Sequence, residues 1–448
     1  MTKRKYFGTD GIRGISNVPP MTADIALKIG AATGLYVSLN QKPKRVVIAK
    51  DTRLSGYMLE SAITSGLTSV GLDVFLLGPM PTPAISMMMK SMRADLGIMI
   101  SASHNTYEYN GIKIFGPDGY KLSDENETEI EMIIQNLDNF DLSKMKIGKA
   151  KRIDDAQARY IEYLKGTLSK ELTLDGMNIV IDSANGAGYK VAPLILWELG
   201  ANVISIGDKP NGQNINQDYG STSLKNIIDT VVKNKADIGI ALDGDADRII
   251  VIDEKGEIVD GDKLLAIIAK EWQETKKLKK NSVVATILSN IGLEDYLGNQ
   301  SIELHRTMVG DRYVSQYMRE NGYNLGGEKS GHIILTDYST TGDGILAALH
   351  ILAIMKKSKQ KISDLAKLID PYPQIQKNFI IKEDHTPDIS QLRELSEKYQ
   401  RKIGDKGRVL IRLSGTEPLV RVMVESKDKK LLDQTLTEIT ASLNELLI

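Results

Sequence analysis

Short apolar runs rich in β-branched residues alternate with longer amphipathic segments along most of the 448-residue chain. The run RVVIAKD at 45–51 precedes SGYMLESAITSGLTSVG, NIVIDSANGAG at 178–188 precedes YKVAPLILWELG, and SVVATILSN at 282–290 precedes IGLEDYLG. Strands that alternate with helices are typical of α/β layers built on parallel sheets. The alternation therefore predicts an α/β fold, and the length predicts about two to four domains, because one hydrophobic core does not extend over so long a chain.

A weak internal repeat divides the chain further. ADLGIMISASHN at 94–105 aligns with ADIGIALDGDAD at 236–247, and YNLGGEKSGHI at 323–333 has the same outline of an apolar strand followed by a polar loop. In open parallel sheets, ligands bind beyond the carboxyl ends of the strands. We therefore expect three related α/β units, each with one polar loop, and we expect the three loops to face one cleft.

The C-terminal part of the chain has a different pattern. DPYPQIQ at 370–376 is interrupted by prolines, and we interpret it as a linker. GRVLIRLSGTEPLVRVMVES at 407–426 predicts strand, turn and strand, and KKLLDQTLTEITASLNELL predicts an amphipathic helix after them. These patterns predict a small α+β domain. The expected domains are 1–152, 153–254, 255–371 and 372–448.

The composition argues against several classes of protein. Lys plus Arg number 57 and Asp plus Glu number 58, for a net charge of -1, so no global basic field attracts nucleic acid or an anionic membrane. Cysteine is absent, which excludes disulfides and thiolate sites. The start, MTKRKYFGTDG, has no apolar core of a signal peptide, and no run of 18 apolar residues appears. We expect a cytoplasmic protein.

Three carboxylates in the segment DGDADR at 243–248 follow an apolar run: Asp243, Asp245 and Asp247. They repel one another unless a cation neutralises them, and carboxylate oxygens suit Mg²⁺. A Ca²⁺-binding EF-hand loop is one alternative, but it requires glycine where this chain has Arg248, and a helix where IIVID predicts a strand. A solvated acidic turn is the other alternative. The pattern favours a Mg²⁺ site.

The segment RLSGTEPLVR at 412–421 predicts an anion site. Gly415 lets backbone N–H groups approach a ligand, and Ser414 and Thr416 add hydroxyl donors. Arg412 and Arg421 can each donate two hydrogen bonds to phosphate oxygens. The alternative is a hairpin turn flanked by surface arginines.

The loop GGEKSGH at 326–332 is ambiguous by itself. Glu328 and Ser330 are separated by one residue, so an extended loop would direct both side chains to one side, where they could bind vicinal sugar hydroxyls. A turn that uses the glycines is the alternative.

The loop SASHN at 101–105 is ambiguous as well. A serine can carry phosphate, and His104 and the nearby Lys113 can manage charge or protons. The alternative is a strand-end turn in which Ser and Asn make local hydrogen bonds.

Together, these motifs resemble those of the α-D-phosphohexomutases. KYFGTDGIRG opens the chain, ISASHNTYEYNGIKIFGPDGYKL resembles the family's phosphoserine loop, and DGDADR resembles its Mg²⁺ loop. GGEKSGHIILTDYSTTGDG resembles its sugar loop and RLSGTEPLVRVMVE its phosphate-binding loop. The motifs follow the family order over nearly the whole chain. The resemblance implies three similar α/β domains with mixed parallel sheets and a smaller C-terminal α+β domain around a central cleft.

The resemblance also implies roles for individual residues. Ser103, rather than Ser101, would carry the phosphate, and Arg248 would steady it. The candidates for proton handling would be His104 and Lys113, with the catalytic residue Arg13 nearby. The implied ligands of one Mg²⁺ per site are Ser103, Asp243, Asp245 and Asp247. The implied substrate-binding residues are Glu328, Ser330, Arg412, Ser414, Gly415, Thr416 and Arg421.

The motifs KYFGTDGIRG, GIKIFGPDG and TTGDG favour the family branch that acts on glucosamine phosphates. The implied reaction interconverts glucosamine 6-phosphate and glucosamine 1-phosphate, with glucosamine 1,6-bisphosphate as intermediate and activator. It would feed amino-sugar nucleotide and cell-wall precursor synthesis. The alternatives are a phosphoglucomutase/phosphomannomutase and a non-catalytic sugar-phosphate binding protein. The expected partners are the phosphosugar, a second copy in a homodimer and a kinase for the first phosphorylation, without nucleic acid or membrane.

Overall fold

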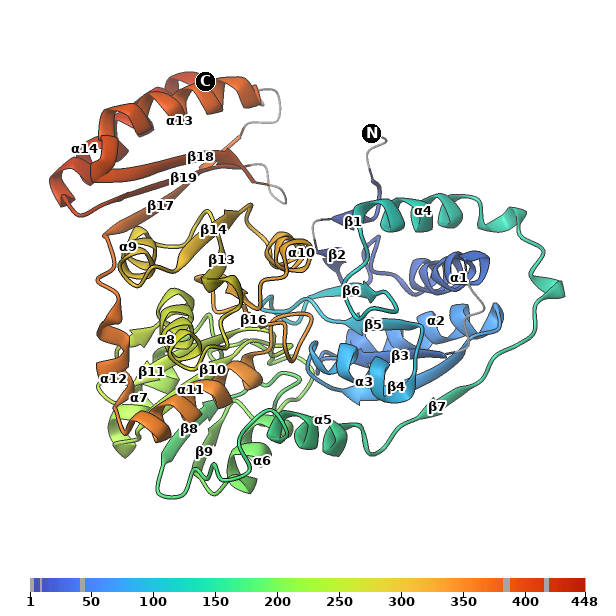
Figure 1. Ribbon diagram of the computed structural model, residues 1–448. Helices are drawn as coiled ribbons and strands as arrows, with labels where there is room; N and C mark the ends of the chain where they lie inside the picture. The colour runs from blue at the N-terminus through green and yellow to red at the C-terminus, as the bar shows by residue number, and fades with distance from the viewer. Residues whose placement is uncertain (1–3, 9, 41–44, 382–386, 415–418, 448) are drawn as a thin grey trace. The chain divides into compact units, whose positions relative to one another are not determined.

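The computed structural model describes residues 4–8, 10–40, 45–381, 387–414 and 419–447. The chain forms two compact units (Figure 1). The larger, which we call the main unit, contains residues 1–287 and 304–368. The smaller, the C-terminal unit, contains residues 288–303 and 369–448.

The first α/β domain of the main unit has a seven-stranded sheet in the order β1-β2-β6-β5-β3-β4-β7. The strands are β1 Phe7–Gly8, β2 Gly11–Ile15, β3 Arg45–Lys50, β4 Asp73–Pro79, β5 Leu96–Ile100, β6 Tyr109–Phe115 and β7 Ala150–Arg152. Its helices are α1 Ala23–Asn40, α2 Ser55–Ser69, α3 Ala84–Met92 and α4 Asp124–Gln135. All five residues of β5 are buried, which explains its unbroken apolar sequence.

The second domain has a five-stranded sheet in the order β12-β11-β10-β8-β9. The strands are β8 Asn178–Asp182, β9 Asn202–Ile206, β10 Ile238–Leu242, β11 Ile249–Asp253 and β12 Ile258–Val259. Its helices are α5 Ala156–Lys165, α6 Val191–Glu198 and α7 Lys225–Asn234. The strand predicted at IIVID is confirmed as β11, so the acidic loop lies between two strands rather than before a helix.

The third domain has a four-stranded sheet in the order β14-β13-β15-β16. The strands are β13 Ser282–Thr286, β14 Glu303–Thr307, β15 Leu325–Gly327 and β16 Ile333–Leu335. The main helices are α8 Gly261–Glu274, α10 Asp311–Asn321, α11 Gly344–Ser358 and α12 Ile362–Leu365.

The same local arrangement occurs once in each of the three sheets. A buried strand ends in a polar loop, and an antiparallel strand returns beside it: β5 with β6, β10 with β11, and β15 with β16. The three intervening loops are SASHN, DGDADR and the sugar loop of the predicted repeat. The structure therefore confirms three related α/β units. The return strands also make the sheets mixed, whereas strand–helix alternation alone predicted parallel sheets.

The C-terminal unit is a three-stranded antiparallel sheet in the order β17-β19-β18. Its elements are α9 Ile291–Asn299, β17 Gln374–Ile380, α13 Ile389–Ile403, β18 Gly407–Leu413, β19 Leu419–Ser426 and α14 Lys429–Leu446. The predicted strands and final helix are confirmed. The linker prediction for 370–376 was wrong at its end, because 374–376 already belong to β17 and pair with β19.

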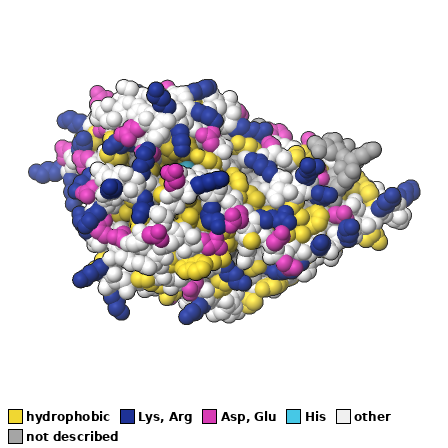
Figure 2. Space-filling model, turned by 60° about the horizontal axis from the view of Figure 1, so that its bottom comes forward, with side chains coloured by type: hydrophobic (Ala, Val, Ile, Leu, Met, Phe, Trp, Pro, Cys, Tyr) yellow, Lys and Arg dark blue, Asp and Glu magenta, His cyan; other side chains and the backbone are white. Residues whose placement is uncertain are grey.

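Lys and Arg side chains are interspersed with Asp and Glu on the face in Figure 2, which agrees with the near-zero net charge. Among the helices of the described residues, none is both long and apolar enough to cross a membrane.

Candidate active site

Ser103 lies in the loop after β5 with its backbone in the left-handed region, at φ +51°. This conformation is unfavourable for a residue with a side chain. The residue is 1% exposed, and its N–H donates a 2.9 Å hydrogen bond to Ser101 Oγ. Ser101 therefore helps to hold the loop, and the Ser103 hydroxyl is directed elsewhere.

That hydroxyl contacts the acidic loop of the second domain. Ser103 Oγ donates a 2.6 Å hydrogen bond to Asp243 Oδ2. The acidic loop also contacts the sugar loop of the third domain: at its end, the N–H of Ile249 donates a 2.9 Å hydrogen bond to the carbonyl of Gly331. The structure thus brings the three predicted loops together.

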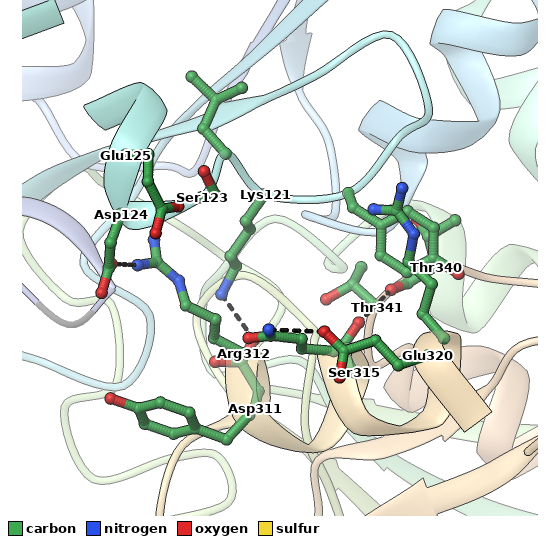
Figure 3. A pocket seen from close by; sticks show the side chains of 15 residues that line it. Lys121, Ser123, Asp124, Glu125, Asp311, Arg312, Ser315, Glu320, Thr340 and Thr341 are labelled. Carbon is green, nitrogen blue, oxygen red and sulfur yellow. Dashed lines mark hydrogen bonds and ion pairs between the residues drawn. The ribbon is translucent and has the colours of Figure 1, made fainter. Parts of the chain in front are cut away.

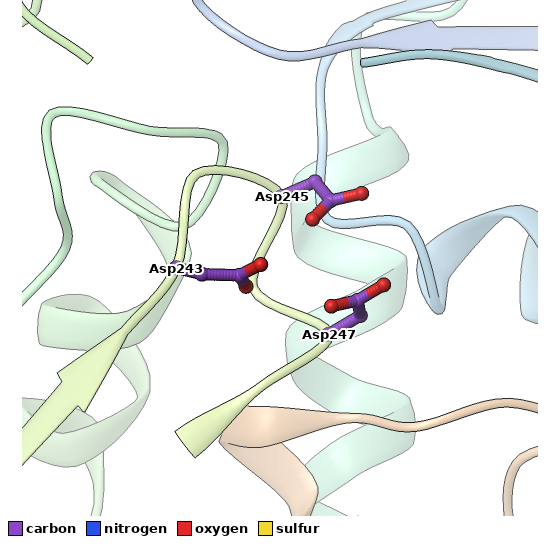
Figure 4. A group of neighbouring side chains, drawn as sticks. All are labelled: Asp243, Asp245 and Asp247. Atoms are coloured by element: carbon purple, nitrogen blue, oxygen red, sulfur yellow. The ribbon is translucent and has the colours of Figure 1, made fainter. Parts of the chain in front are cut away.

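The three aspartates of the loop after β10 point toward one another (Figure 4). One oxygen of each lies within 4.8 Å of one from the other two, and all three residues are buried. Burial and the neighbouring carboxylates of Asp247 and Asp245 raise the pKa of Asp243 well above its ordinary value. A bound cation would remove this repulsion, so the arrangement can hold a metal ion.

The hydrogen bonds of Asp245 leave one oxygen available. Its Oδ2 accepts hydrogen bonds from Thr82 Oγ1 at 2.6 Å and Lys113 Nζ at 2.8 Å. Its Oδ1 is buried and accepts none from any part of the chain that the structure describes. A buried carboxylate oxygen without a donor is costly, and a hard cation would satisfy it. The donor set therefore fits a Mg²⁺-type ion.

Two of the predicted cationic residues, Lys113 and Arg13, lie near the triad. Lys113 on β6 lies 2.8 Å from Asp245 and 3.4 Å from an Asp247 oxygen. Burial opposes its charge, but the carboxylates of Asp245, Asp10 and Asp247 raise the pKa of Lys113 overall. Arg13 on β2 forms an ion pair with Asp10 and donates to the carbonyl of Ala102.

Arg248 and His104 lie at the edge of the same group. The Nε of Arg248 lies 3.9 Å from Asp247 Oδ1. Burial, followed by the positive charges of Arg248 and Arg13, lowers the pKa of His104 to about 4. His104 is therefore neutral near pH 7, and its buried Nδ1 has no hydrogen-bond partner among the described residues.

The sugar loop is a turn and not the extended segment on which the sequence argument depended. The N–H of Gly331 donates to the carbonyl of Glu328 at 2.9 Å, which closes the turn between β15 and β16. Consequently, Glu328 is buried and accepts a 3.1 Å hydrogen bond from the N–H of Gly310, whereas Ser330 is exposed. The alternation that was expected to place both side chains on one side does not apply here.

The predicted anion residues lie in the C-terminal unit. Arg412 on β18 and Arg421 on β19 are direct cross-strand partners. Burial, together with the charge of Arg421, lowers the pKa of Arg412. The N–H of Ser414 donates to the carbonyl of Leu419 at 2.8 Å. Gly415 and Thr416 lie outside the described residues.

Comparison with known proteins gives four matches to the domains of one family. The phosphoglucomutase/phosphomannomutase alpha/beta/alpha domains I, II and III match residues 4–141, 158–256 and 260–372, and the C-terminal domain of that family matches residues 358–442. The chain belongs to this phosphohexomutase family.

Similar proteins within the family are known from sequence and structure. A protein named phosphoglucosamine mutase from Parvibaculum lavamentivorans is 54% identical over 440 residues, or 98% of each chain. The crystal structure of a phosphoglucomutase/phosphomannomutase family protein from Burkholderia thailandensis superposes with a TM-score of 0.83 at 23% identity, covering 98% of this chain and 97% of that one. N-acetylphosphoglucosamine mutase from Aspergillus fumigatus, in complex with GlcNAc-6P and magnesium, has a TM-score of 0.67 at 17% identity, covering 100% and 96%.

Sequence reasoning missed a charged network in this phosphohexomutase. Lys121 donates to Asp10 at 2.5 Å and to Asp311 at 2.6 Å, and so connects the first domain with the third. His332 lies between Asp311, at 3.5 Å, and Asp247, at 3.7 Å. No spacing within the sequence links these residues.

A pocket of about 380 Å³ borders this network (Figure 3). Its wall includes Lys121 and Asp311, which are joined across it, and Arg312, which pairs with Asp124. The charged side chains named here are already paired. The pocket therefore marks the contact of the first and third domains.

Proposed function

We propose that this phosphohexomutase interconverts glucosamine 6-phosphate and glucosamine 1-phosphate through a phosphoserine at Ser103. The observation that carries the proposal is the 2.6 Å hydrogen bond from Ser103 Oγ to Asp243, because it places a nucleophilic hydroxyl against a potential metal site. The choice of glucosamine is supported by the 54% identity to a named phosphoglucosamine mutase.

In the proposed cycle, phosphorylated Ser103 transfers its phosphoryl group to the free hydroxyl of the bound sugar phosphate. The bond from phosphorus to Oγ breaks, a bond from phosphorus to the sugar oxygen forms, and the proton of the sugar hydroxyl is passed to Oγ, so that Ser103 ends as a free hydroxyl. The resulting 1,6-bisphosphate turns over in the site. Ser103 then takes the other phosphoryl group, which releases the isomeric monophosphate.

His104 is the proposed proton acceptor. The imidazole is neutral near pH 7, which is the form that can accept a proton, and the negative charge of a phosphate on the adjacent Ser103 would raise its pKa toward the operating pH. Lys113 and Arg13 are cations in the buried site and are proposed to stabilise negative charge on the transferred group. Arg248, whose pKa is raised by Asp247 and Asp243 against the effect of burial, is proposed to orient the phosphoserine.

The proposed ligands of one Mg²⁺ are Ser103, Asp243, Asp245 and Asp247. When bound, such an ion supplies positive charge to the phosphoryl oxygens in the transition state. The buried Asp245 Oδ1 and the mutual repulsion of the three carboxylates support this assignment. The magnesium complex of the Aspergillus fumigatus relative is consistent with it.

Two further groups are proposed to bind the substrate. Glu328 and Ser330 would bind sugar hydroxyls, with Glu328 held by the N–H of Gly310. The proposed phosphate-binding residues of the C-terminal unit are Arg412, Ser414, Gly415, Thr416 and Arg421. The adjacent arginines on β18 and β19 support this proposal, because two guanidinium groups at opposite positions of neighbouring strands can both donate to the oxygens of one phosphate.

The decisive experiment assays the purified protein side by side on the 1-phosphates of glucosamine, N-acetylglucosamine, glucose and mannose, with Mg²⁺ and a hexose 1,6-bisphosphate activator. We expect the highest kcat/KM with glucosamine 1-phosphate, and we expect no turnover by Ser103→Ala. A higher kcat/KM with glucose or mannose phosphate would reassign the substrate. Absence of mutase activity on all four would refute the catalytic proposal.

The predicted partners need separate tests. A homodimer predicts twice the mass of the chain in light scattering. A kinase or the bisphosphate is the proposed source of the first phosphate, and intact mass after incubation with each would distinguish them.

A further inference from the structure

We propose that Asn216, in the second domain, is a positioning residue that holds the backbone of the Ser103 loop in the conformation needed for phosphoryl transfer. This inference rests on the proposed role of Ser103 as phosphate carrier. Asn216 acts through the Ser103 loop and does not belong to the acidic triad.

The Ser103 backbone requires support from outside its own loop. Its φ of +51° is unfavourable for serine, so the loop would relax toward a more common conformation unless other groups fixed it. Such a relaxation would turn Oγ away from Asp243, which it now contacts at 2.6 Å.

Asn216 supplies two of the hydrogen bonds that fix this loop. Its Nδ2 donates to the carbonyl of Ser103 at 2.9 Å and to the carbonyl of Asn105 at 2.8 Å. The side chain thus joins the residues on both sides of His104. Asn216 is 8% exposed, so water does not readily replace these hydrogen bonds.

Asn216 is itself fixed within the second domain. Its N–H donates to the carbonyl of Ala184 at 2.8 Å, and its own φ is +58°. A Cβ added to Gly244 would lie 2.6 Å from the Ser103 carbonyl and 2.8 Å from Asn216 Nδ2, so the metal-loop backbone closes over both groups. The carbonyl of Ser103 is therefore held by the domain that carries the acidic triad.

A second donor comes from the first domain. Arg53 is fully buried, pairs with Asp51 and donates from Nη2 to the carbonyl of Ser103 at 3.2 Å. Asp51 in turn belongs to the strand-end loop beside β5, since its N–H donates to the carbonyl of Ile100. Arg53 fixes the Ser103 loop within the first domain, whereas Asn216 fixes it relative to the acidic triad of the second domain.

The test uses Asn216→Asp, which keeps the size of the side chain and its tolerance of positive φ but replaces the donor by a carboxylate oxygen. Asn216→Gly removes the side chain without adding charge and also tolerates positive φ. The matched control is Asn226→Asp on α7. Asn226 also donates its amide to a carbonyl, that of Asp218 at 2.8 Å, but it does not bond the Ser103 loop.

For both Asn216 variants we expect kcat with glucosamine 1-phosphate to fall about tenfold or more, because small displacements of reacting groups are costly. We expect KM to stay within about twofold. The phosphorus NMR resonance of phosphoserine 103 should shift in both variants and stay unchanged in Asn226→Asp. If Asn216 had a merely structural role, the variants would have a lower melting temperature, but kcat would not fall selectively while KM stayed nearly constant.

Two results would overturn the inference: a kcat within about twofold of wild type in both Asn216 variants, or an equal loss in Asn226→Asp. The activity of the wild-type protein distinguishes a failure of the positioning inference from a failure of the proposed function. Wild-type protein without mutase activity would refute the proposed function, whereas active wild type with fully active Asn216 variants would refute only the positioning role.

Discussion

The hydroxyl of Ser103 donates a 2.6 Å hydrogen bond to the carboxylate of Asp243, although the two residues are 140 positions apart in the sequence. Both are almost fully buried. The contact joins the first domain, through the loop after β5, to the second, through the loop after β10. A phosphoryl group on Ser103 would therefore lie beside the acidic triad.

Ser103→Ala should abolish mutase turnover, because this hydroxyl is the proposed carrier of the phosphoryl group. Peptide mapping of the active wild-type protein should locate the phosphate on Ser103. Ser101→Ala is the matched control: it removes a hydroxyl that accepts the Ser103 N–H, so activity should fall without disappearing. Phosphate on Ser101 alone would contradict the assignment.

Asp245→Asn should lower Mg²⁺ affinity by about tenfold or more, because it removes one of three carboxylate charges while keeping the shape of the side chain. Isothermal titration with Mg²⁺ and a circular dichroism spectrum would separate lost binding from lost folding. Asp229→Asn, an exposed change on α7, should leave affinity unchanged. Chelation that leaves wild-type activity intact would rule out the metal site.

The buried His350 should make the protein less stable in weak acid. Burial, with a smaller effect of Lys277, lowers the pKa of His350 to about 4 from 6.5. Between about pH 6.5 and about pH 4, the unfolded chain binds a proton at His350 that the folded protein does not. The free energy of unfolding therefore falls as the pH falls through this range. At pH 5 the different protonation of His350 in the two states should lower the free energy of unfolding by about 2 kcal/mol.

His350→Phe keeps an aromatic ring against Tyr338, whose centroid lies 5.0 Å from that of His350, but cannot take up a proton. The difference in unfolding free energy between pH 8 and pH 5, measured by urea denaturation, should be about 2 kcal/mol smaller in the variant than in wild type. Because each protein is compared with itself at the two pH values, an effect of the substitution on packing that is the same at both values cancels. Equal differences in the two proteins would refute the prediction.

Arg412→Gln should raise the KM for glucosamine 1-phosphate by about tenfold, because a charged hydrogen-bond donor to phosphate is lost. In the absence of ligand the melting temperature of the variant should stay within a few degrees of wild type, because glutamine keeps a polar side chain at a partly exposed strand position. Arg401→Gln, an exposed change on α13, serves as the control. A lower melting temperature with unchanged KM would indicate a purely structural arginine.

The sequence alone predicted the features that depend on neighbouring residues. Asp243, Asp245 and Asp247 lie within one five-residue segment, so a single turn brings their carboxylates together and their chemistry could be inferred before the fold was known. The apolar runs β5 and β10 predicted buried strands, because strands covered on both faces need apolar residues at every position. The repeated unit of an apolar strand followed by a polar loop came from the same local pattern, whereas the antiparallel strand that returns in each unit was not part of that prediction.

Only the tertiary structure decided which distant groups meet. It brought Asn216 to the carbonyl of Ser103 and joined Asp10 to Asp311 through Lys121. It also formed a turn at 328–331, which left Glu328 buried and Ser330 exposed. Hydrophobic periodicity reports the local conformation and the buried face of an element, whereas these contacts depend on how whole domains pack, and that packing brings together residues that no sequence spacing relates.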